Sequence, residues 1–317
     1  MSEPHIRIGT RGSALALWQA EWVKTALQTR HPTQGVDLVI IKTQGDKILD
    51  VPLAKVGGKG LFVKELEEAL LAGEIDLAVH SMKDVPTVIP DGLELVAILE
   101  REDPRDVLLS VHHAGLSSLP RGAVVGSSSL RRQSQLLHLR PDLQVVSLRG
   151  NVNTRIGKLE SGQFAAILLA AAGVKRLQLT RHVVEYLDPR QMIPANGQGA
   201  IGIETRQGDP RMAALLTPLH HTETGQCVRA ERALLATLEG GCQVPIAGHA
   251  QLRGETLTLL GRVASLDGTE MITQEMEGSV TAPESLGRRL AHLLLERGGR
   301  RILQEIGAIS PASPALS

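Results

Sequence analysis

Cys242 has the setting that most favours covalent chemistry, because it occupies a turn, LEGGCQVP at 238–245, between helical and strand-like sequence. Two glycines end the preceding helix and give the backbone freedom at the turn. A thiol on such a turn suits nucleophilic duty or the covalent carriage of a group, whereas most lone cysteines of intracellular chains are inert core residues. Cys227 falls near the apolar stripe of the preceding helix, 222–238, and we expect it in the core.

Five arginines lie at or just beyond the carboxyl ends of predicted strands: Arg131, Arg132, Arg149, Arg155 and Arg176. If these arginines only covered solvent-exposed faces of helices, they would not recur at the ends of strands. The same edge offers helix N-termini and serine hydroxyls, among them Ser129, which favour anions. We interpret it as a cleft for a ligand with several carboxylates or phosphates, and guanidinium groups suit both, so residue type does not choose between them.

Two more turns place polar side chains at strand ends: Arg11 and Ser13 after 5–10, and Ser81, Lys83 and Asp84 after 75–81. Open α/β sheets build their sites at such ends. Ser13 is a candidate N-cap of the next helix, so its turn is either an anion site or an ordinary strand–helix turn. Asp84 is either a site residue or a turn residue held by Lys83.

The segment 43–60 is long, glycine-rich and basic, and it shows no clean hydrophobic period. It is not a phosphate-binding P-loop, because Leu53 stands where a glycine is required and no Ser or Thr follows Lys59. Long unstructured connections in compact domains are usually functional or mobile. We interpret 43–60 as a mobile cover over a site, with Lys55 and Lys59 on it.

Three other stretches match motifs only formally. The glycines at 197–202 fit G-x-G-x-x-G, but they precede strand-like sequence instead of a helix, so they do not predict a dinucleotide site. The pairs His112-His113 and His220-His221 point apart as sequence neighbours and lack a third ligand at suitable spacing. We therefore predict no metal site.

The composition excludes several classes of function. The 317-residue chain has 34 Lys plus Arg and 34 Asp plus Glu, so it has no net field to attract nucleic acid or membrane. Aromatic residues make up 2%, which argues against a base-stacking platform. Two cysteines indicate a reducing compartment, and neither a signal peptide nor a membrane span is evident. We expect a cytoplasmic protein that binds neither nucleic acid nor membrane.

The order of strands and helices predicts an α/β protein with two domains or three. Two series of alternating strands and helices are separated by a charged, proline-broken crossing at 100–106, and a helix with three strands follows them. The expected units are residues 1–99 plus 200–218, residues 105–194, an α+β domain at 222–309 and a disordered tail at 310–317.

Several motifs together resemble the porphobilinogen deaminase family, also called hydroxymethylbilane synthase, and the resemblance runs from residue 7 to the C-terminal helix. The motifs are VGGKGLF at 56–62, HSMKDVP at 80–86, SSSLRR at 127–132, LRGNV at 148–152, GQGA at 197–200 and EGGCQVP at 239–245. Asn196 stands where the family usually has valine, and Asn153 where it often has glycine. Neither departure replaces a charged residue or a thiol.

The resemblance implies three domains: two doubly wound domains like type II periplasmic binding proteins, with the site between them, and a small domain with a three-stranded antiparallel sheet. It implies a dipyrromethane cofactor, which the enzyme makes from its own substrate and holds through a thioether to Cys242. Four porphobilinogen units are then added with loss of ammonia, and hydrolysis releases hydroxymethylbilane. We expect a monomeric transferase of tetrapyrrole biosynthesis whose chemistry involves no metal.

The resemblance also assigns roles to residues. Asp84 is the expected catalytic residue, which stabilises the electron-poor pyrrole left by ammonia and takes the proton lost after each carbon–carbon bond forms. The expected cofactor contacts are Lys83, Asp84, Ser129, Arg131, Arg132 and Arg155. The expected substrate contacts are Arg11, Ser13, Gln19, Phe62, Ser81, Arg149, Arg155, Arg176 and Gln198. The arginine-rich edge fits this chemistry, because each pyrrole carries an acetate and a propionate that need cationic partners.

Two other classes stay open at this point. A two-domain solute-binding protein with an added domain would explain the arginines but not Cys242, and the lack of a signal peptide counts against it. A nucleic-acid-binding protein is disfavoured by the zero net charge and the few aromatic residues. Consumption of porphobilinogen would distinguish an enzyme from a binding module.

Overall fold

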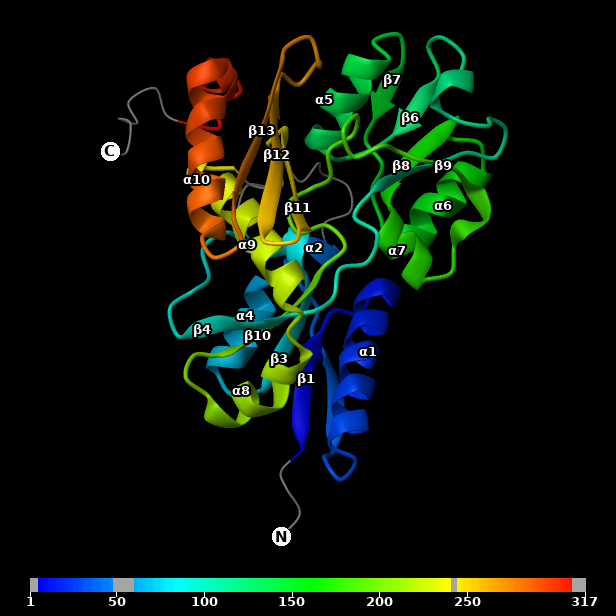
Figure 1. Cartoon of the computed structure of the whole chain (residues 1–317). Coiled ribbons are helices and arrows are strands. Elements are labelled where there is room, and N and C mark those ends of the chain that lie inside the picture. The colour runs from blue at the N-terminus through cyan, green and yellow to red at the C-terminus, as the bar shows by residue number, and fades with distance from the viewer. Residues whose placement is uncertain (1–4, 48–59, 241–243, 310–317) are drawn as a thin grey trace.

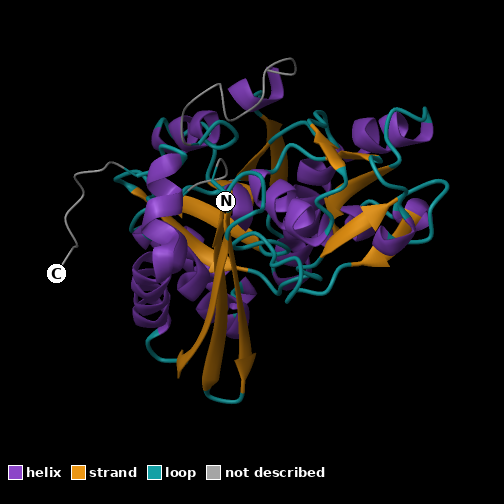
Figure 2. Ribbon diagram, turned by 90° about the horizontal axis from the view of Figure 1, so that it is seen from above, coloured by secondary structure: helices purple, strands orange, loops and turns teal. Residues whose placement is uncertain are grey.

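The computed structural model of the chain describes residues 5–47, 60–240 and 244–309. Two five-stranded sheets and one three-stranded sheet form three parts, which we call the first, second and third domains in chain order (Figure 1). The first domain lies below the other two in Figure 1, and the second and third stand side by side above it. Figure 2 shows the same parts from above, with the strands of each running beside its helices.

The first domain has the strand order β2-β1-β3-β10-β4, in which β10 runs antiparallel to both of its neighbours. Its strands are β1 (Ile6–Thr10), β2 (Val36–Ile40), β3 (Leu77–Ser81), β4 (Leu93–Ile98) and β10 (Ile201–Arg206). Its helices are α1 (Ala14–Arg30), α2 (Gln44–Lys47), α4 (Lys64–Leu71), α8 (Pro210–Leu216) and the 3-10 turns η1 (Met82–Asp84) and η4 (Thr217–Leu219). Because side chains alternate along β3, Leu77 and Val79 pack with α1, and Ala78 packs with α4.

The second domain repeats this order as β7-β6-β8-β5-β9, with β5 antiparallel to both neighbours. Its strands are β5 (Asp106–Leu109), β6 (Val124–Gly126), β7 (Gln144–Val146), β8 (Ala166–Ala170) and β9 (Val183–Tyr186). Its helices are α5 (Leu130–Leu139), α6 (Val152–Glu160), α7 (Ala171–Arg176) and the 3-10 turns η2 (Leu116–Ser118) and η3 (Thr180–His182). Leu168 and Ile167 of β8 point to opposite faces, where they pack with α5 and α6, so helices cover both sides of the sheet.

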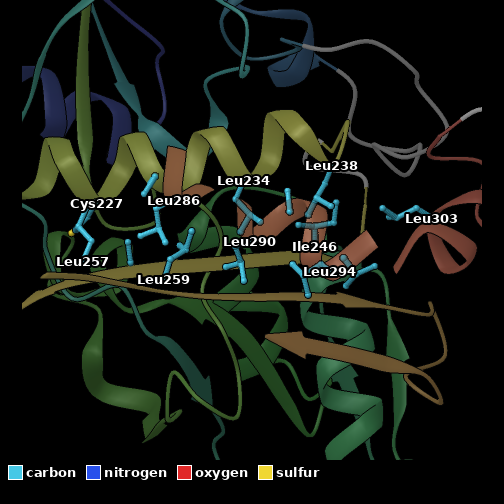
Figure 3. Close-up of a cluster of buried hydrophobic side chains, with 14 of the residues drawn as sticks. Cys227, Leu234, Leu238, Ile246, Leu257, Leu259, Leu286, Leu290, Leu294 and Leu303 are labelled. Atoms are coloured by element: carbon cyan, nitrogen blue, oxygen red, sulfur yellow. The ribbon is translucent and has the colours of Figure 1, made fainter. Parts of the chain in front are cut away.

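The third domain packs two helices against one face of an antiparallel sheet, β11-β12-β13. Its elements are α9 (Thr222–Thr237), β11 (Ile246–Arg253), β12 (Thr256–Ala264), β13 (Met271–Ser279), α10 (Pro283–Leu294), the segment Leu295–Gly299, which is kinked at Gly298, and α11 (Arg300–Glu305). Cys227 of α9 lies in the core with Leu234 and Leu257 (Figure 3). Burial raises the pKa of its thiol to about 11, so the predicted core role of Cys227 is confirmed.

Two segments connect the first and second domains: 99–105, between β4 and β5 (the first crossing), and 187–200, between β9 and β10 (the second crossing). The Glu231 carboxylate of α9 ties both crossings to the third domain. It is fully buried and accepts hydrogen bonds from Arg101 Nη1 and Nη2, at 2.7 and 3.0 Å, in the first crossing. It also accepts the backbone N–H of Gly197 in the second crossing at 2.6 Å and that of Ala250 on β11 at 2.8 Å. Burial opposes ionisation, but the Arg101 guanidinium and the His249 ring, whose Nδ1 lies 3.5 Å from Oε1, lower the pKa of Glu231 to about 2.

The structure confirms the α/β class with two doubly wound domains and a three-stranded antiparallel sheet. It also contains two strands that the sequence pattern does not predict, β5 and β9. Every residue of β5 is buried and its first is the charged Asp106, so the strand shows no alternation, and its apolar run Val107–Leu109 is shorter than the roughly four residues that indicate a buried strand. The tail 310–317 and residues 48–59 of the predicted cover lie outside the described residues.

We expect Glu231→Gln to lower the free energy of unfolding by about 3–5 kcal/mol, because it leaves Arg101 buried without a counter-charge. Urea denaturation followed by circular dichroism measures the change. Glu284→Gln on α10 is the matched control, because the pair of Glu284 with Arg229 is partly exposed to solvent and contributes about 1 kcal/mol or less. Equal losses in the two variants would contradict the importance of the buried carboxylate.

Candidate functional site

A pocket opens at the carboxyl end of β3, between the N-terminal turns of α1 and the turn η1. Residues predicted from separate motifs line it together: Arg11, Ser13, Gln19, Phe62, Ser81 and Asp84. They meet because the strand–helix turn after β1 and the end of the adjacent parallel strand β3 lie at one edge of the sheet. The structure therefore brings together the first-domain part of the predicted site.

The Arg11 guanidinium lies between a carboxylate and an aromatic ring. It forms an ion pair with Asp46 of α2, and its Cζ is 4.2 Å from the centre of the Phe62 ring. Asp46 also accepts the hydroxyl of Thr43 at 2.8 Å. Burial opposes ionisation of Asp46, but the hydrogen bond and charge of Arg11 lower its pKa. A substrate carboxylate at Arg11 must therefore replace this internal carboxylate or share the guanidinium with it.

Three polar residues of the predicted site also support the fold. Ser13 caps α1 by accepting the backbone N–H of Ala16 at 3.3 Å, as predicted, and Ser129 caps α5 in the same way. Gln19 is 2% exposed, and its Nε2 donates to the Ser81 hydroxyl at 2.9 Å. This bond joins α1 to the end of β3 and orients the Ser81 hydroxyl at the pocket.

One buried carboxylate, Asp106, is shared by the two arginines at the start of α5. Arg131 Nη1 lies 2.7 Å from Oδ2 of Asp106, and Arg132 Nη2 lies 2.8 Å from Oδ1. Gln198 Nε2 donates to the same Oδ1 at 2.9 Å. Burial opposes ionisation, but the two guanidinium groups hold the pKa of Asp106 well below its usual range. Arg131 and Arg132 are 5% and 6% exposed, so they are built into the second-domain wall.

The charges of the first and second domains meet at Lys83 and Asp84. Burial lowers the pKa of the Lys83 ammonium, Asp84 opposes this effect and Arg132 adds to it. Burial also lowers the pKa of Arg155 on α6 to about 10, helped by Arg132 and Arg149 and opposed by Asp84. The Asp84 carboxylate therefore acts electrostatically on cations of both domains. Asp84 belongs to the first domain and Arg155 to the second.

Arg149 and Arg176 extend the cationic edge. Burial lowers the pKa of both, and that of Arg176 to about 10. Arg176 Nη2 donates to the Gly199 carbonyl at 2.8 Å, and its Cζ lies 5.4 Å from the centre of the Trp18 ring on α1. Both pKa values are lowered because these guanidinium groups are partly removed from water. An anionic ligand at this edge would act in the opposite direction and raise these pKa values.

Cys242, Lys55 and Lys59 lie outside the described residues. The chain on both sides of the cysteine is described. Helix α9 ends at Thr237, Glu239 has a left-handed backbone with φ 52°, and β11 begins at Ile246. The predicted setting of Cys242, between a helix and a strand of the third domain, is therefore present.

The sequence analysis does not single out Asp46 or Asp106, the two carboxylates that hold predicted site arginines. Asp46 stands in the predicted cover segment, and Asp106 was assigned to the crossing. The signal available for Asp106 is its place directly before the apolar run Val107–Leu109, because a charge at the buried start of a strand requires a partner.

Across the described ranges, no group of three or more His, Cys, Asp and Glu side chains is arranged to hold a metal ion. His220 accepts the backbone N–H of Ile98 through Nδ1 at 3.1 Å, and His221 caps α9, so both belong to the fold. Nor does any helix in these ranges combine the length and apolar character needed to cross a membrane.

Two doubly wound domains joined by two crossings define a class of two-domain α/β proteins, in which sites form at the carboxyl ends of the strands. The chain matches the models of one protein family along most of its length. Residues 6–214 match the family described as porphobilinogen deaminase, dipyromethane cofactor binding domain, and residues 225–296 match porphobilinogen deaminase, C-terminal domain. The chain belongs to the porphobilinogen deaminase family.

Similar curated proteins cover almost the whole chain. The porphobilinogen deaminase of Pelobacter propionicus is 58% identical over 306 residues, 96% of this chain and 98% of that protein. That of Geobacter sulfurreducens is 57% identical over 306 residues, 96% of each. Among solved structures, a putative methionine-binding lipoprotein of Bacillus subtilis aligns with 71% of this chain and 93% of its own, at 14% identity and a TM-score of 0.44.

We expect Asp106→Asn to lower the free energy of unfolding by about 3–5 kcal/mol at neutral pH, because it leaves two buried guanidinium groups without their shared counter-charge. The folded-state pKa of Asp106 is depressed, so its contribution is present above the unfolded-state pKa of about 3.9 and is lost as the pH falls below it. The difference between wild type and variant should hold above about pH 5 and shrink below about pH 4.

Urea unfolding at a series of pH values measures this difference. Asp37→Asn is the control, because the pair of Asp37 with His5 is exposed and should contribute about 1 kcal/mol or less. If wild type and Asp106→Asn had the same free energy of unfolding at neutral pH, the carboxylate would not stabilise the arginine pair.

Proposed function

We propose that this chain is a transferase that joins four porphobilinogen molecules head to tail, with loss of ammonia, on a dipyrromethane primer attached to Cys242, and then releases hydroxymethylbilane by hydrolysis in tetrapyrrole biosynthesis. One observation carries the proposal: Asp84 lines a pocket with Arg11 and Ser81, and its charge acts on cations of both domains, Lys83 and Arg155. The family to which the chain belongs indicates the reaction, and the cations indicate a ligand with several carboxylates.

The cationic edge suits a polycarboxylate that grows. Each porphobilinogen brings an acetate and a propionate, so the negative charge of the product rises with every cycle. Burial disfavours the charged forms of Arg155 and Arg176 when no ligand is bound, and a carboxylate beside them offsets that cost. We assign substrate binding to Arg11, Ser13, Gln19, Phe62, Ser81, Arg149, Arg155, Arg176 and Gln198.

The residues of the site also fit the primer. A dipyrromethane carries carboxylate side chains, and Lys83 and Arg155 are partly buried cations whose pKa values such groups would raise. When bound, the primer supplies the terminal pyrrole carbon to which each new unit is joined. We assign Lys83, Asp84, Ser129, Arg131, Arg132 and Arg155 to hold it, and Cys242 to tether it. Lys55 and Lys59 are assigned to the cover.

Asp84 is assigned the charge and proton work of the reaction. Its carboxylate lines the pocket with Ser81. Facing the pyrrole N–H groups, it would stabilise the cation that remains when ammonia leaves porphobilinogen. At ~4 Å and an effective dielectric constant near ~20 this contact contributes up to about 4 kcal/mol, or about a thousandfold in rate. The same carboxylate would accept the proton lost after each carbon–carbon bond forms.

The proposal includes the organisation of the chain. The domain bounds are 1–99 plus 200–218, 105–194 and 222–309. We propose a cytoplasmic monomer that binds neither nucleic acid nor membrane. Light scattering after size exclusion tests the monomer.

We expect the purified chain to be heavier than its sequence by one two-pyrrole adduct, because the primer is bound covalently. Intact mass spectrometry measures the adduct. It should be absent from Cys242→Ser and retained by Cys227→Ser, since Cys227 is a core residue with a raised thiol pKa. An adduct lost from Cys227→Ser and kept by Cys242→Ser would contradict the assignment.

We expect Asp84→Asn to keep the fold and to lose nearly all turnover, about a thousandfold or more, because the neutral amide neither stabilises the pyrrole cation nor accepts a proton. Consumption of porphobilinogen measures turnover, and circular dichroism checks the fold. Turnover near that of the wild type would remove Asp84 from the mechanism.

A further inference from the structure

The helix that leads to Cys242 packs on the turn that carries Asp84. Val228 of α9 is fully buried in one apolar cluster with Met82 and Val85, the residues on either side of Lys83 and Asp84. Arg232 lies one helical turn further along α9, on the same face of the helix. The third domain therefore contacts the Asp84 turn through consecutive turns of a single helix.

The Arg232 guanidinium binds the backbone directly after Asp84. Its Nη1 lies 3.2 Å from the Val85 carbonyl oxygen, and its Nη2 lies 2.7 Å from that of Pro86 and 3.2 Å from that of Thr87. Three successive carbonyl groups thus accept hydrogen bonds from one rigid group. A planar guanidinium suits this arrangement, whereas an ammonium is a point charge without the fork geometry.

Arg232 occupies a position that disfavours its positive charge, because the guanidinium is largely withdrawn from water. Burial lowers the pKa of its guanidinium, and the charge of Glu204 on β10 opposes that shift. Glu204 is itself fully buried and lies 2.9 Å from Nε2 of His80 on β3. By contrast, Arg229 on the same helix forms a partly exposed ion pair with Glu284. Arg232 is therefore set apart from an ordinary surface arginine by its burial and by its backbone partners.

We propose that Arg232 is a positioning residue, which fixes the Asp84 turn of the first domain relative to α9, the helix that precedes Cys242 in the chain. The proposal rests on the roles proposed above for Asp84 and Cys242. The connection is short: from Arg232 to the end of α9 at Thr237 the helix rises roughly 7.5 Å, at ~1.5 Å per residue. The Asp84 turn and the C-terminal end of α9 are thus held by one rigid element.

Arg232→Gln should lower kcat about 10- to 100-fold and leave KM for porphobilinogen within about twofold, because misplacing a catalytic group by ~1 Å has effects of this size and the substrate-binding cations are unchanged. Arg232→Lys keeps the charge without the fork and should fall between Arg232→Gln and the wild type. Arg229→Gln is the matched control on α9 and should keep kcat. Intact mass should show the adduct in all three variants.

A second measurement is independent of turnover. Hydrogen exchange followed by mass spectrometry, on proteins that also carry Cys242→Ser, reports the mobility of the turn without the primer. Arg232→Gln should speed exchange in peptides covering 81–89, where the Val85 N–H donates to the Met82 carbonyl at 3.3 Å. Arg229→Gln should leave these peptides unchanged.

Wild-type kcat and exchange in Arg232→Gln would overturn the positioning role. A fall in kcat with unchanged exchange at 81–89, or an equal fall in Arg229→Gln, would also overturn it, because the effect would then not act through the turn. Failure of the proposed function looks different. In that case Asp84→Asn turns over normally, or the adduct is absent or on another residue, whatever Arg232→Gln does.

Discussion

Positive charge withdrawn from water near the ends of the strands is the constraint to which the rest of the structure responds. Guanidinium groups lose hydration when they leave water, and each needs an anion or several acceptors in return. Asp106 serves Arg131 and Arg132, and Asp46 serves Arg11. Arg155 keeps a lowered pKa. A ligand that brings negative charge to these guanidinium groups would offset the cost of their burial.

The same constraint explains how the third domain is attached. Its contacts with the second domain are largely polar: Arg262 Nη1 donates to Gln135 Oε1 at 2.7 Å, and His138 Nδ1 lies 2.9 Å from the Gly268 carbonyl oxygen. The Glu231 carboxylate also binds the third domain to both crossings, through Arg101 and the backbone N–H of Gly197. A domain that carries a covalent primer has to be oriented towards both walls of the cleft, and hydrogen bonds fix orientation more narrowly than apolar packing does.

The fold class and the edge position of the site follow from local signals. Apolar runs that end at glycine, serine or arginine mark strand ends, and strand ends share one edge of a sheet, so Arg149 was predictable as a neighbour of Arg155, whose pKa it lowers. The choice of partners was not. Asp106 is 25 residues from Arg131 in the sequence, and Arg232 is 146 residues from Pro86. Such pairs depend on how domains approach one another, and no periodicity or capping pattern records that approach.

The antiparallel strand in each large sheet affects the order in which the chain folds during synthesis. The second sheet is built from one continuous stretch, from β5 to β9, so it is complete once residue 186 has left the ribosome. The first sheet contains β10 between β3 and β4, so it cannot close until residue 206 has emerged. The N-terminal domain thus finishes after the domain inserted into it, and its β3 edge waits unpaired in the meantime.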